Sequence, residues 1–342
     1  MSYIMLALGW ILKLCSLLTG NYGIAIILFT ILIKAILLPM MIKQQKSMAM
    51  TQKLQPLLNE LQQKYANDKE KLNAETMKLY QKYKVNPMSG CLPMLIQLPI
   101  LMALYWVVKK PVVYLMGFGE DEVWRIVSAV LDWSDSHPGG LEQFYTALGI
   151  DSMEKLTDSG YRMFGMYEIQ IAEFINSHRE IMNSQWIVET GKNYDVLNFN
   201  FIGLDLSQTP NLGAFFGLFV GRVSQLSLQT ILLWIIPLLS GLSSLAASKL
   251  SEKMQPQSAP QRDKNGEEQP NPMKSMMLFM PLISAWFAFT LPAAIGLYWI
   301  VSNILQLVQQ YVLMKVVKVD LTDEQIEGEI VNVKKNRKKR KK

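Results

Sequence analysis

Residues 22–42 read YGIAIILFTILIKAILLPMMI, an apolar stretch interrupted by a single charge at Lys34. A helix of about 20 residues spans the roughly 30 Å hydrocarbon core of a bilayer, so this stretch predicts a transmembrane helix. A charge in the middle of such a helix costs about 2.5–3.5 kcal/mol on insertion scales. Lys34 therefore either reaches the cytoplasmic headgroups with its long stem or faces a watery cavity among helices.

Four further segments are apolar enough to cross the bilayer, and they are residues 90–109, 228–248, 275–291 and 293–314. The last two are separated at Pro292, because one helix over both would be nearly twice the length that a bilayer requires. Half of the residues in the chain are apolar, which exceeds the need of a soluble domain. We therefore predict an all-α polytopic membrane protein with five transmembrane helices.

Basic side chains are unevenly distributed among the segments that join these spans. Residues 43–86 carry nine basic and four acidic side chains, and residues 315–342 carry ten and five. Residues 249–274 carry five basic and four acidic side chains. Residues 110–226, in contrast, carry seven basic and fifteen acidic side chains. Loops rich in lysine and arginine stay on the cytoplasmic side. The N-terminus and residues 110–226 are therefore predicted outside, and the loop 249–274 and the basic tail 315–342 are predicted in the cytoplasm.

Three segments outside the spans have helical features. Residues 1–20 combine an apolar run with Trp10 and Lys13 and lack a small-residue cleavage site, so we expect an interfacial amphipathic helix that is not removed as a signal peptide. Residues 43–86 repeat apolar side chains at spacings of three and four around a turn, which predicts a two-helix hairpin. The hairpin fits either a spacer or a docking arm. Residues 114–195 predict an insert of several short helices.

The end of the chain is strongly basic. Eight of its last nine residues carry a positive charge: Lys334, Lys335, Arg337, Lys338, Lys339, Arg340, Lys341 and Lys342. Such a run does not fold by itself and attracts polyanions, so ribosomal RNA and anionic lipid headgroups are the candidate partners. The alternative is a tail that only solubilises or orients the protein.

Polar side chains recur within the predicted spans. Thr30 lies one turn before Lys34 on the same face, and Gln97 lies in the middle of the second span. In the last span, one face and its flank carry Trp299, Ser302, Asn303, Gln306 and Gln310. No span contains an acidic partner for Lys34. This combination favours a hydrated groove among the helices, and the alternative is ordinary interhelical hydrogen bonding.

The sequence contains no motif for catalysis, nucleotide binding or metal binding. Cys15 and Cys91 lie far apart in apolar surroundings, which favours packing roles over a disulfide. Two histidines are too few for a dedicated zinc site. We therefore expect no enzymatic activity and no cofactor. The energy for any transport would therefore come from binding, from the membrane potential or from another molecular machine such as the ribosome.

Several motifs resemble those of YidC-type membrane protein insertases. The first is NYGIAII at residues 21–27, followed by Lys34 in the same span. The second is VNPMSGCLP at residues 85–93, followed by QLP at 97–99. Shorter matches are LDLS at 204–207, PLLSG at 237–241, YWIVSN at 298–303 and QQ at 309–310.

The resemblance covers about residues 1–110 and 196–316, a core that mitochondrial and chloroplast insertases share. It implies that the five helices form a hydrophilic groove open to the cytoplasm and to lipid. In the family the first span carries a cation in this groove, usually arginine, and Lys34 occupies the matching position. Lysine keeps the charge but lacks the fixed fork of donors that arginine presents. The insert at 114–195 departs from the short loop of most bacterial single-core members.

The resemblance therefore implies a membrane protein insertase and chaperone in a bacterial cell membrane. It would move polar segments of nascent membrane proteins through the groove and release their helices into lipid without nucleotide hydrolysis. Nascent membrane proteins, the ribosome, anionic lipids and the general Sec translocon are the expected partners, and the protein would work as a monomer. The main alternative is a small-solute transporter or channel with a polar cavity, and a structural assembly factor is a third.

Overall fold

The computed structural model describes residues 2–65, 68–85, 92–120, 122–150, 167–221, 227–254, 272–317, 326 and 328. Over these residues the chain is mostly helical, and the strands form a single antiparallel pair. This confirms the predicted all-α class, while the five spans and their groove stay a prediction.

The chain divides into two compact units. Unit 1 consists of Met1–Ile33, Leu98–Ser243 and Leu282–Asn303. Unit 2 consists of Lys34–Gln97, Ser244–Pro281 and Ile304–Lys342. Several helices therefore contribute residues to both units.

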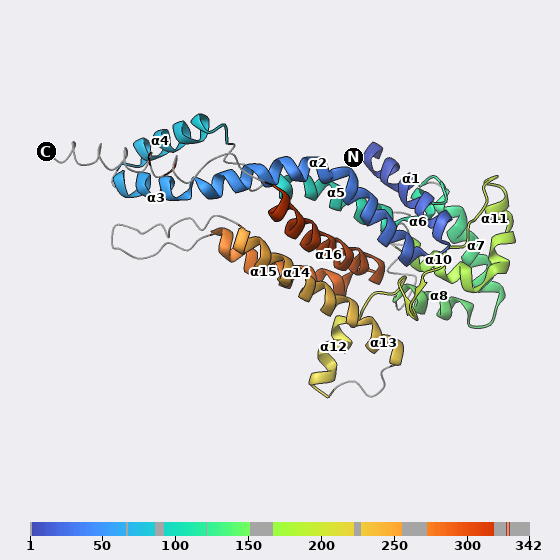
Figure 1. Cartoon of the computed structure of the whole chain (residues 1–342). Helices are drawn as coiled ribbons and strands as arrows, with labels where there is room; N and C mark the ends of the chain where they lie inside the picture. Colours follow the sequence, from blue (N-terminus) through green and yellow to red (C-terminus); the bar gives the residue numbers. More distant parts are fainter. Residues whose placement is uncertain are drawn as a thin grey trace. The chain divides into compact units, whose positions relative to one another are not determined.

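The long helices occupy the apolar stretches of the sequence (Figure 1). They are α1 (Ser2–Thr19), α2 (Tyr22–Lys53), α5 (Leu92–Lys109), α14 (Ile235–Met254), α15 (Pro272–Thr290) and α16 (Ala293–Val316). Among the described residues, Tyr22–Lys53 and Leu228–Ser251 are long and apolar enough to cross a membrane. Shorter apolar helices cover Tyr3–Thr19, Pro99–Lys109 and Pro281–Thr290. α16 carries four amide side chains, which lower its mean hydropathy.

One proline divides the segment that was predicted as the third span. A short helix, α13 (Leu228–Leu233), ends just before α14, and Pro237 lies in the first turn of α14. A proline ring clashes with the carbonyl four residues earlier, here Leu233, and the proline has no N–H to donate. The break at Trp234 follows from both effects.

Tyr22, at the start of α2, lies in the hydrophobic core of unit 1. Its ring is fully buried and meets Phe199 edge-on, with ring centroids 4.9 Å apart. Its hydroxyl donates to the carbonyl of Val108 near the end of α5 at 2.8 Å, and its N–H donates to the carbonyl of Asn198 at 2.8 Å. This one residue therefore joins α2, α5 and the chain that precedes the strands.

A glycine allows α14 and α16 to approach closely within unit 1. A Cβ atom at Gly296 would collide with Cγ2 of Ile236. Small residues at such crossings are common in membrane proteins, where helices associate by close packing because lipid offers no hydrophobic driving force.

The strands β1 (Asn200–Phe201) and β2 (Leu204–Asp205) form a hairpin in unit 1. Its turn places Ile202 and Gly203 at φ values of 54° and 78°. Glycine adopts this left-handed region freely, whereas a β-branched residue is strained there. Ile202 is also largely exposed, at 85 %.

The segment that follows β2 forms backbone hydrogen bonds with the start of α16. The carbonyl of Gln208 accepts from the N–H of Ala293 at 2.8 Å, and the carbonyl of Leu206 accepts from Ala294 at 3.1 Å. The first N–H groups of a helix have no partner within the helix, so these bonds satisfy two of them. The next helix along the chain is α12 (Leu212–Phe219), which precedes α13.

The predicted insert folds as short helices of unit 1. They are α6 (Pro111–Tyr114), α7 (Val123–Ser136), α8 (Gly140–Leu148), α10 (Glu168–Ser177), the 3-10 helix η4 (Arg179–Asn183) and α11 (Gln185–Val188). α7 packs against α8 and α11, and α10 packs against α6 and α8. The apolar face that organises α7 is fully or almost fully buried, and it comprises Val123, Ile126, Val127 and Val130.

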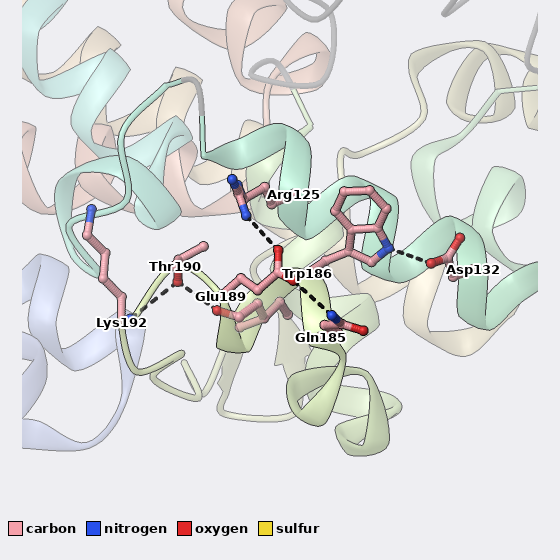
Figure 2. A network of polar contacts seen from close by, with 8 residues as sticks. Arg125, Asp132, Gln185, Trp186, Glu189, Thr190 and Lys192 are labelled. Carbon is pink, nitrogen blue, oxygen red and sulfur yellow. Dashed lines mark hydrogen bonds and ion pairs between the residues drawn. The ribbon is translucent and has the colours of Figure 1, made fainter.

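A polar network fastens α7 to α11 on the surface of the insert (Figure 2). Arg125 Nη1 donates to Glu189 Oε2 at 3.1 Å, and Gln185 Nε2 donates to Glu189 Oε1 at 2.9 Å. The indole N–H of Trp186 donates to Asp132 Oδ2 at 2.5 Å. Exposed ion pairs contribute little to stability, so the buried face of α7 carries most of the packing energy.

In unit 2, α3 (Gln55–Lys64) and α4 (Lys69–Lys82) pack against each other after the end of α2. The side chain of Asp68 caps α4 by accepting from the N–H of Lys71 at 3.0 Å. An apolar cluster joins the two helices, and its buried members are Leu54, Leu57, Leu58, Leu61, Leu79, Val85 and Ile326. Ile326 belongs to the predicted tail and is 6 % exposed, so the apolar seam of these helices also binds part of the C-terminal segment.

Candidate functional site

Lys34 lies in α2, within the longest apolar helix of the described chain. Its side chain is half-buried, and no described carboxylate pairs with its ammonium group. Thr30 precedes it by one turn and is 1 % exposed. The Thr30 hydroxyl donates to the carbonyl of Ile26 at 2.6 Å, so its proton is already engaged by its own helix.

The polar face of α16 (Trp299, Ser302, Asn303, Gln306 and Gln310) contributes three residues to unit 1. Ser302 is buried, and Trp299 contacts the ring of Phe287 with centroids 6.2 Å apart. Asn303 Nδ2 donates to Ser243 Oγ of α14 at 3.1 Å, and Ser243 Oγ in turn donates to the carbonyl of Ser240 at 3.0 Å. The amide of Asn303 therefore joins two helices.

The polar face of α16 continues in unit 2 with Gln306 and Gln310. Gln310 Nε2 donates to Ser251 Oγ of α14 at 3.0 Å, and Gln306 is half-buried. The side-chain oxygens of Gln309 and Gln310 are buried and accept no hydrogen bond among the described residues. A buried acceptor without a donor costs about 1–3 kcal/mol, so each oxygen favours a donor such as water or a polar ligand.

The remaining predicted site residues cannot be placed by their side chains. Gln97 belongs to α5, but its side chain lies outside the described part of the structure. The basic residues 334–342 also lie outside it, as does Cys91. Cys15 is a free, buried cysteine in the core of unit 1. In the described ranges, no group of three or more His, Cys, Asp or Glu side chains is arranged to hold a metal ion.

The predicted groove residues are divided between the two units. Thr30, Ser302 and Asn303 belong to unit 1, whereas Lys34 and Gln310 belong to unit 2. Within each unit, a hydrogen bond from an amide to a serine hydroxyl joins α16 to α14. The serines of α14 that accept these bonds were not predicted as site residues, because serine is common in membrane helices and nothing in its spacing marked it.

The family comparison agrees with the motifs that the sequence carries. The model of the 60Kd inner membrane protein family matches residues 14–153 and 163–320. The chain belongs to this family. The family model covers all five predicted spans and the whole insert except residues 154–162, so the match extends beyond the motif-bearing segments.

Curated relatives of this chain carry the name membrane protein insertase YidC. The relative from Fusobacterium nucleatum is 54 % identical over 106 residues, which are 31 % of this chain and 52 % of the relative. The relative from Geobacter sulfurreducens is 55 % identical over 87 residues, which are 25 % of this chain and 16 % of the relative. The relative from Caldanaerobacter subterraneus is 28 % identical over 318 residues, which are 93 % of this chain and 97 % of the relative.

The match thus spans about half of the Fusobacterium relative and a minor part of the Geobacter relative. Together with the family model, these relatives confirm the resemblance to YidC-type insertases. Membership in the 60Kd inner membrane protein family places the chain among bacterial inner membrane proteins, in agreement with its apolar helices.

Proposed function

We propose that this protein is a membrane protein insertase and chaperone. Polar segments of nascent membrane proteins enter a hydrophilic groove that five transmembrane helices form, open to the cytoplasm and to lipid. The hydrophobic helices of these clients then move into the bilayer. The name that the relatives carry supports this proposal. The observation that carries it is Lys34, the single charge in the apolar residues 22–42 of α2, which pairs with no carboxylate among the described residues.

Lys34 supplies the positive charge of the proposed groove. Desolvating an unpaired ammonium group in lipid is unfavourable, so such a residue faces water or a partner of opposite charge. A client segment that carries aspartate or glutamate offers that partner. The attraction is strongest where water is scarce, since a lower dielectric constant weakens screening.

Polar side chains on α2, α5 and α16 would replace part of the water that a client segment loses. Thr30, Gln97 and the polar face of α16 line the groove in this proposal. The buried side-chain oxygens of Gln309 and Gln310 support it, because they accept no hydrogen bond among the described residues and would accept one from a hydrated segment or from water. Release follows from the hydrophobic effect, as the apolar helix of the client leaves the polar groove for lipid. The cycle needs no nucleotide hydrolysis.

The proposed topology places the N-terminus outside and the C-terminus in the cytoplasm, in line with the basic residues of the predicted cytoplasmic segments. The hairpin of α3 and α4 would then receive clients from the cytoplasm. The basic tail 334–342 would bind ribosomal RNA or anionic lipids, and the general Sec translocon is a further candidate partner. The proposed functional form is a monomer.

A small-solute transporter or channel is the alternative from another class. It would use the same polar side chains to line a path for a solute. Secondary transporters are commonly built from inverted repeats, and the sequence shows none. Solute flux in the absence of client insertion would favour this alternative.

Reconstitution of the purified protein tests the proposal. Proteoliposomes that contain this protein alone are expected to insert a single-span client with a short acidic outside segment, measured by protease protection. Lys34→Arg is expected to retain insertion, whereas Lys34→Ala lowers it at least about tenfold, because a lost charge pair of about 1.4 kcal/mol or more has this effect.

Lys43→Ala is the matched control, since Lys43 lies on the same helix but is exposed near its predicted cytoplasmic end. Full activity of Lys34→Ala would eliminate the charge-attraction mechanism. Solute flux without any insertion would eliminate the insertase proposal itself.

A further inference from the structure

The helix α12 has no polar or charged side chain. Its sequence is LGAFFGLF, and only its cap is polar: the Asn211 side chain accepts from the N–H of Ala214 at 2.9 Å. This helix belongs to residues 110–226, which the charge distribution predicts to be extracellular and therefore surrounded by water. An aqueous helix normally carries a polar face, so this composition is unusual for such a position.

One aromatic residue shows the depth at which α12 lies. Phe215 contacts Trp234 with ring centroids 5.2 Å apart, and it contacts Phe289 at 5.1 Å. Trp234 follows the start of α13 at Leu228 by six residues, or roughly 9 Å at 1.5 Å per residue. Phe289 lies in the last turn of α15. α12 therefore lies beside the outer part of these helices and not beyond their ends.

On either side of Phe215, apolar side chains of α12 are uncovered. Phe216 and Leu218 are 59 % and 49 % exposed, and Val220 after the helix is 65 % exposed. The same kind of surface continues on α13, where Leu228 and Ile231 are exposed. α13 belongs to the stretch Leu228–Ser251, which is long and apolar enough to cross a membrane. The exposed apolar surface of α12 thus continues onto the exposed apolar side chains of α13.

We propose that α12 lies within the outer leaflet of the membrane, with Phe216, Leu218 and Val220 in contact with the acyl chains of phospholipids. At eight residues, or about 12 Å, the helix is too short to cross the roughly 30 Å core. The chain therefore enters the outer leaflet at α12 and crosses the bilayer only with α13 and α14. The polar cap at Asn211 then lies toward the headgroups, where water can satisfy its remaining groups.

Lipid explains this surface better than a protein partner does. A docking surface for a protein combines an apolar centre with polar groups at its rim that fix the orientation of the partner. The exposed face of α12 offers no such polar group, whereas contact with acyl chains requires none. A second copy of this chain or another membrane protein on the same face would exclude lipid, and the experiment below separates these cases.

Spin labels in proteoliposomes test the proposal on the full-length protein. Single cysteines replace Phe216, Leu218 and Val220 in a background with Cys15→Ala and Cys91→Ala. Leu238→Cys on the exposed side of α14 is the lipid control, and Asp135→Cys on the surface of the insert is the water control. For each label, the collision rate is measured with oxygen, which is enriched in lipid, and with a water-soluble nickel complex.

The labels at 216 and 218 are expected to give an oxygen-to-nickel ratio close to that at 238 and several-fold above that at 135. A ratio equal to that at 135 would place α12 in water and overturn the proposal. Protection from both reagents would also overturn it, because a protein surface would then cover the helix. If one of the two variants fails to reconstitute, the label at 220 decides together with the other, since Val220 is also exposed at the end of α12.

Discussion

Glu168, the first residue of α10, has a carboxyl group enclosed within unit 1, and only 1 % of the residue is exposed. Its Oε2 accepts from the N–H of Val113 in α6 at 3.1 Å, while Oε1 accepts no hydrogen bond among the described residues. Burial raises the pKa of Glu168 to about 8, although the backbone N–H groups and Lys110 act against this shift. The carboxyl is therefore neutral over much of the physiological range.

This shift makes the stability of the insert depend on pH. The raised pKa means that the contribution of Glu168 is complete below its ordinary value of 4.5 and is lost as pH rises through about 8. We expect the melting temperature of the wild type to fall by a few degrees between about pH 5 and pH 8.5. Glu168→Gln keeps the shape without the charge, so its melting temperature should stay level and exceed that of the wild type at high pH.

Glu142→Gln on the exposed side of α8 is the control, and it should melt like the wild type at each pH. The measurement is thermal unfolding in lipid nanodiscs followed by circular dichroism. A wild type with the same melting temperature throughout this range would contradict the role of Glu168.

At the scale of elements, amide-to-serine bonds contribute to the pairing of α14 and α16. We predict that Asn303→Ala and Ser243→Ala each destabilise the protein, and that the double variant loses less than the sum. The coupling should be about 0.6 kcal/mol, the average for interhelical hydrogen bonds in membranes. Steric trapping or detergent unfolding of the four proteins measures this value. Strictly additive effects would mean that the bond contributes nothing.

The sequence predicted the helical elements well because apolar runs and helical spacing are local properties. Their ends were harder to predict. α2 was expected to end near Ile42 but continues to Lys53, since lysine, glutamine and methionine are good helix formers and nothing in this stretch stops the helix. The predicted third span is interrupted near Pro237, where α13 ends at Leu233 and α14 begins at Ile235.

The sequence indicated which polar side chains share a face of α16, but not which residues they contact. The spacing of four, three and four placed Asn303 and Gln310 on one face of a helix. It could not indicate that Ser243 and Ser251 would accept their hydrogen bonds, because that depends on how α14 and α16 are aligned. The apolar composition of α12 was visible in the sequence, yet its position beside Trp234 required tertiary contacts.

For the molecule as a whole, the basic tail at residues 334–342 predicts binding to ribosomes through electrostatic attraction. Deleting residues 334–342 should weaken co-sedimentation with ribosomes at low salt, because eight positive charges near RNA phosphates release counterions. Replacing the eight basic residues by glutamine should weaken it equally. A scrambled tail of the same composition is the control and should bind like the wild type, since charge alone recruits RNA.

The salt dependence belongs to the same experiment. Ribosome binding by the wild type should fall steeply as salt increases, and the shortened protein should show a smaller slope. Unchanged ribosome binding after the deletion would show that the tail does not bind the ribosome. Flotation with anionic vesicles would then test whether its partner is lipid.

The close crossing of α14 and α16 at Gly296 restricts the order in which mutations can accumulate. Any side chain at position 296 meets Ile236 and wedges the helices apart, so such a change alone is harmful. The same change becomes tolerable once position 236 has lost its branched side chain. The two sites are therefore epistatic, and a lineage that enlarges one must first shrink the other.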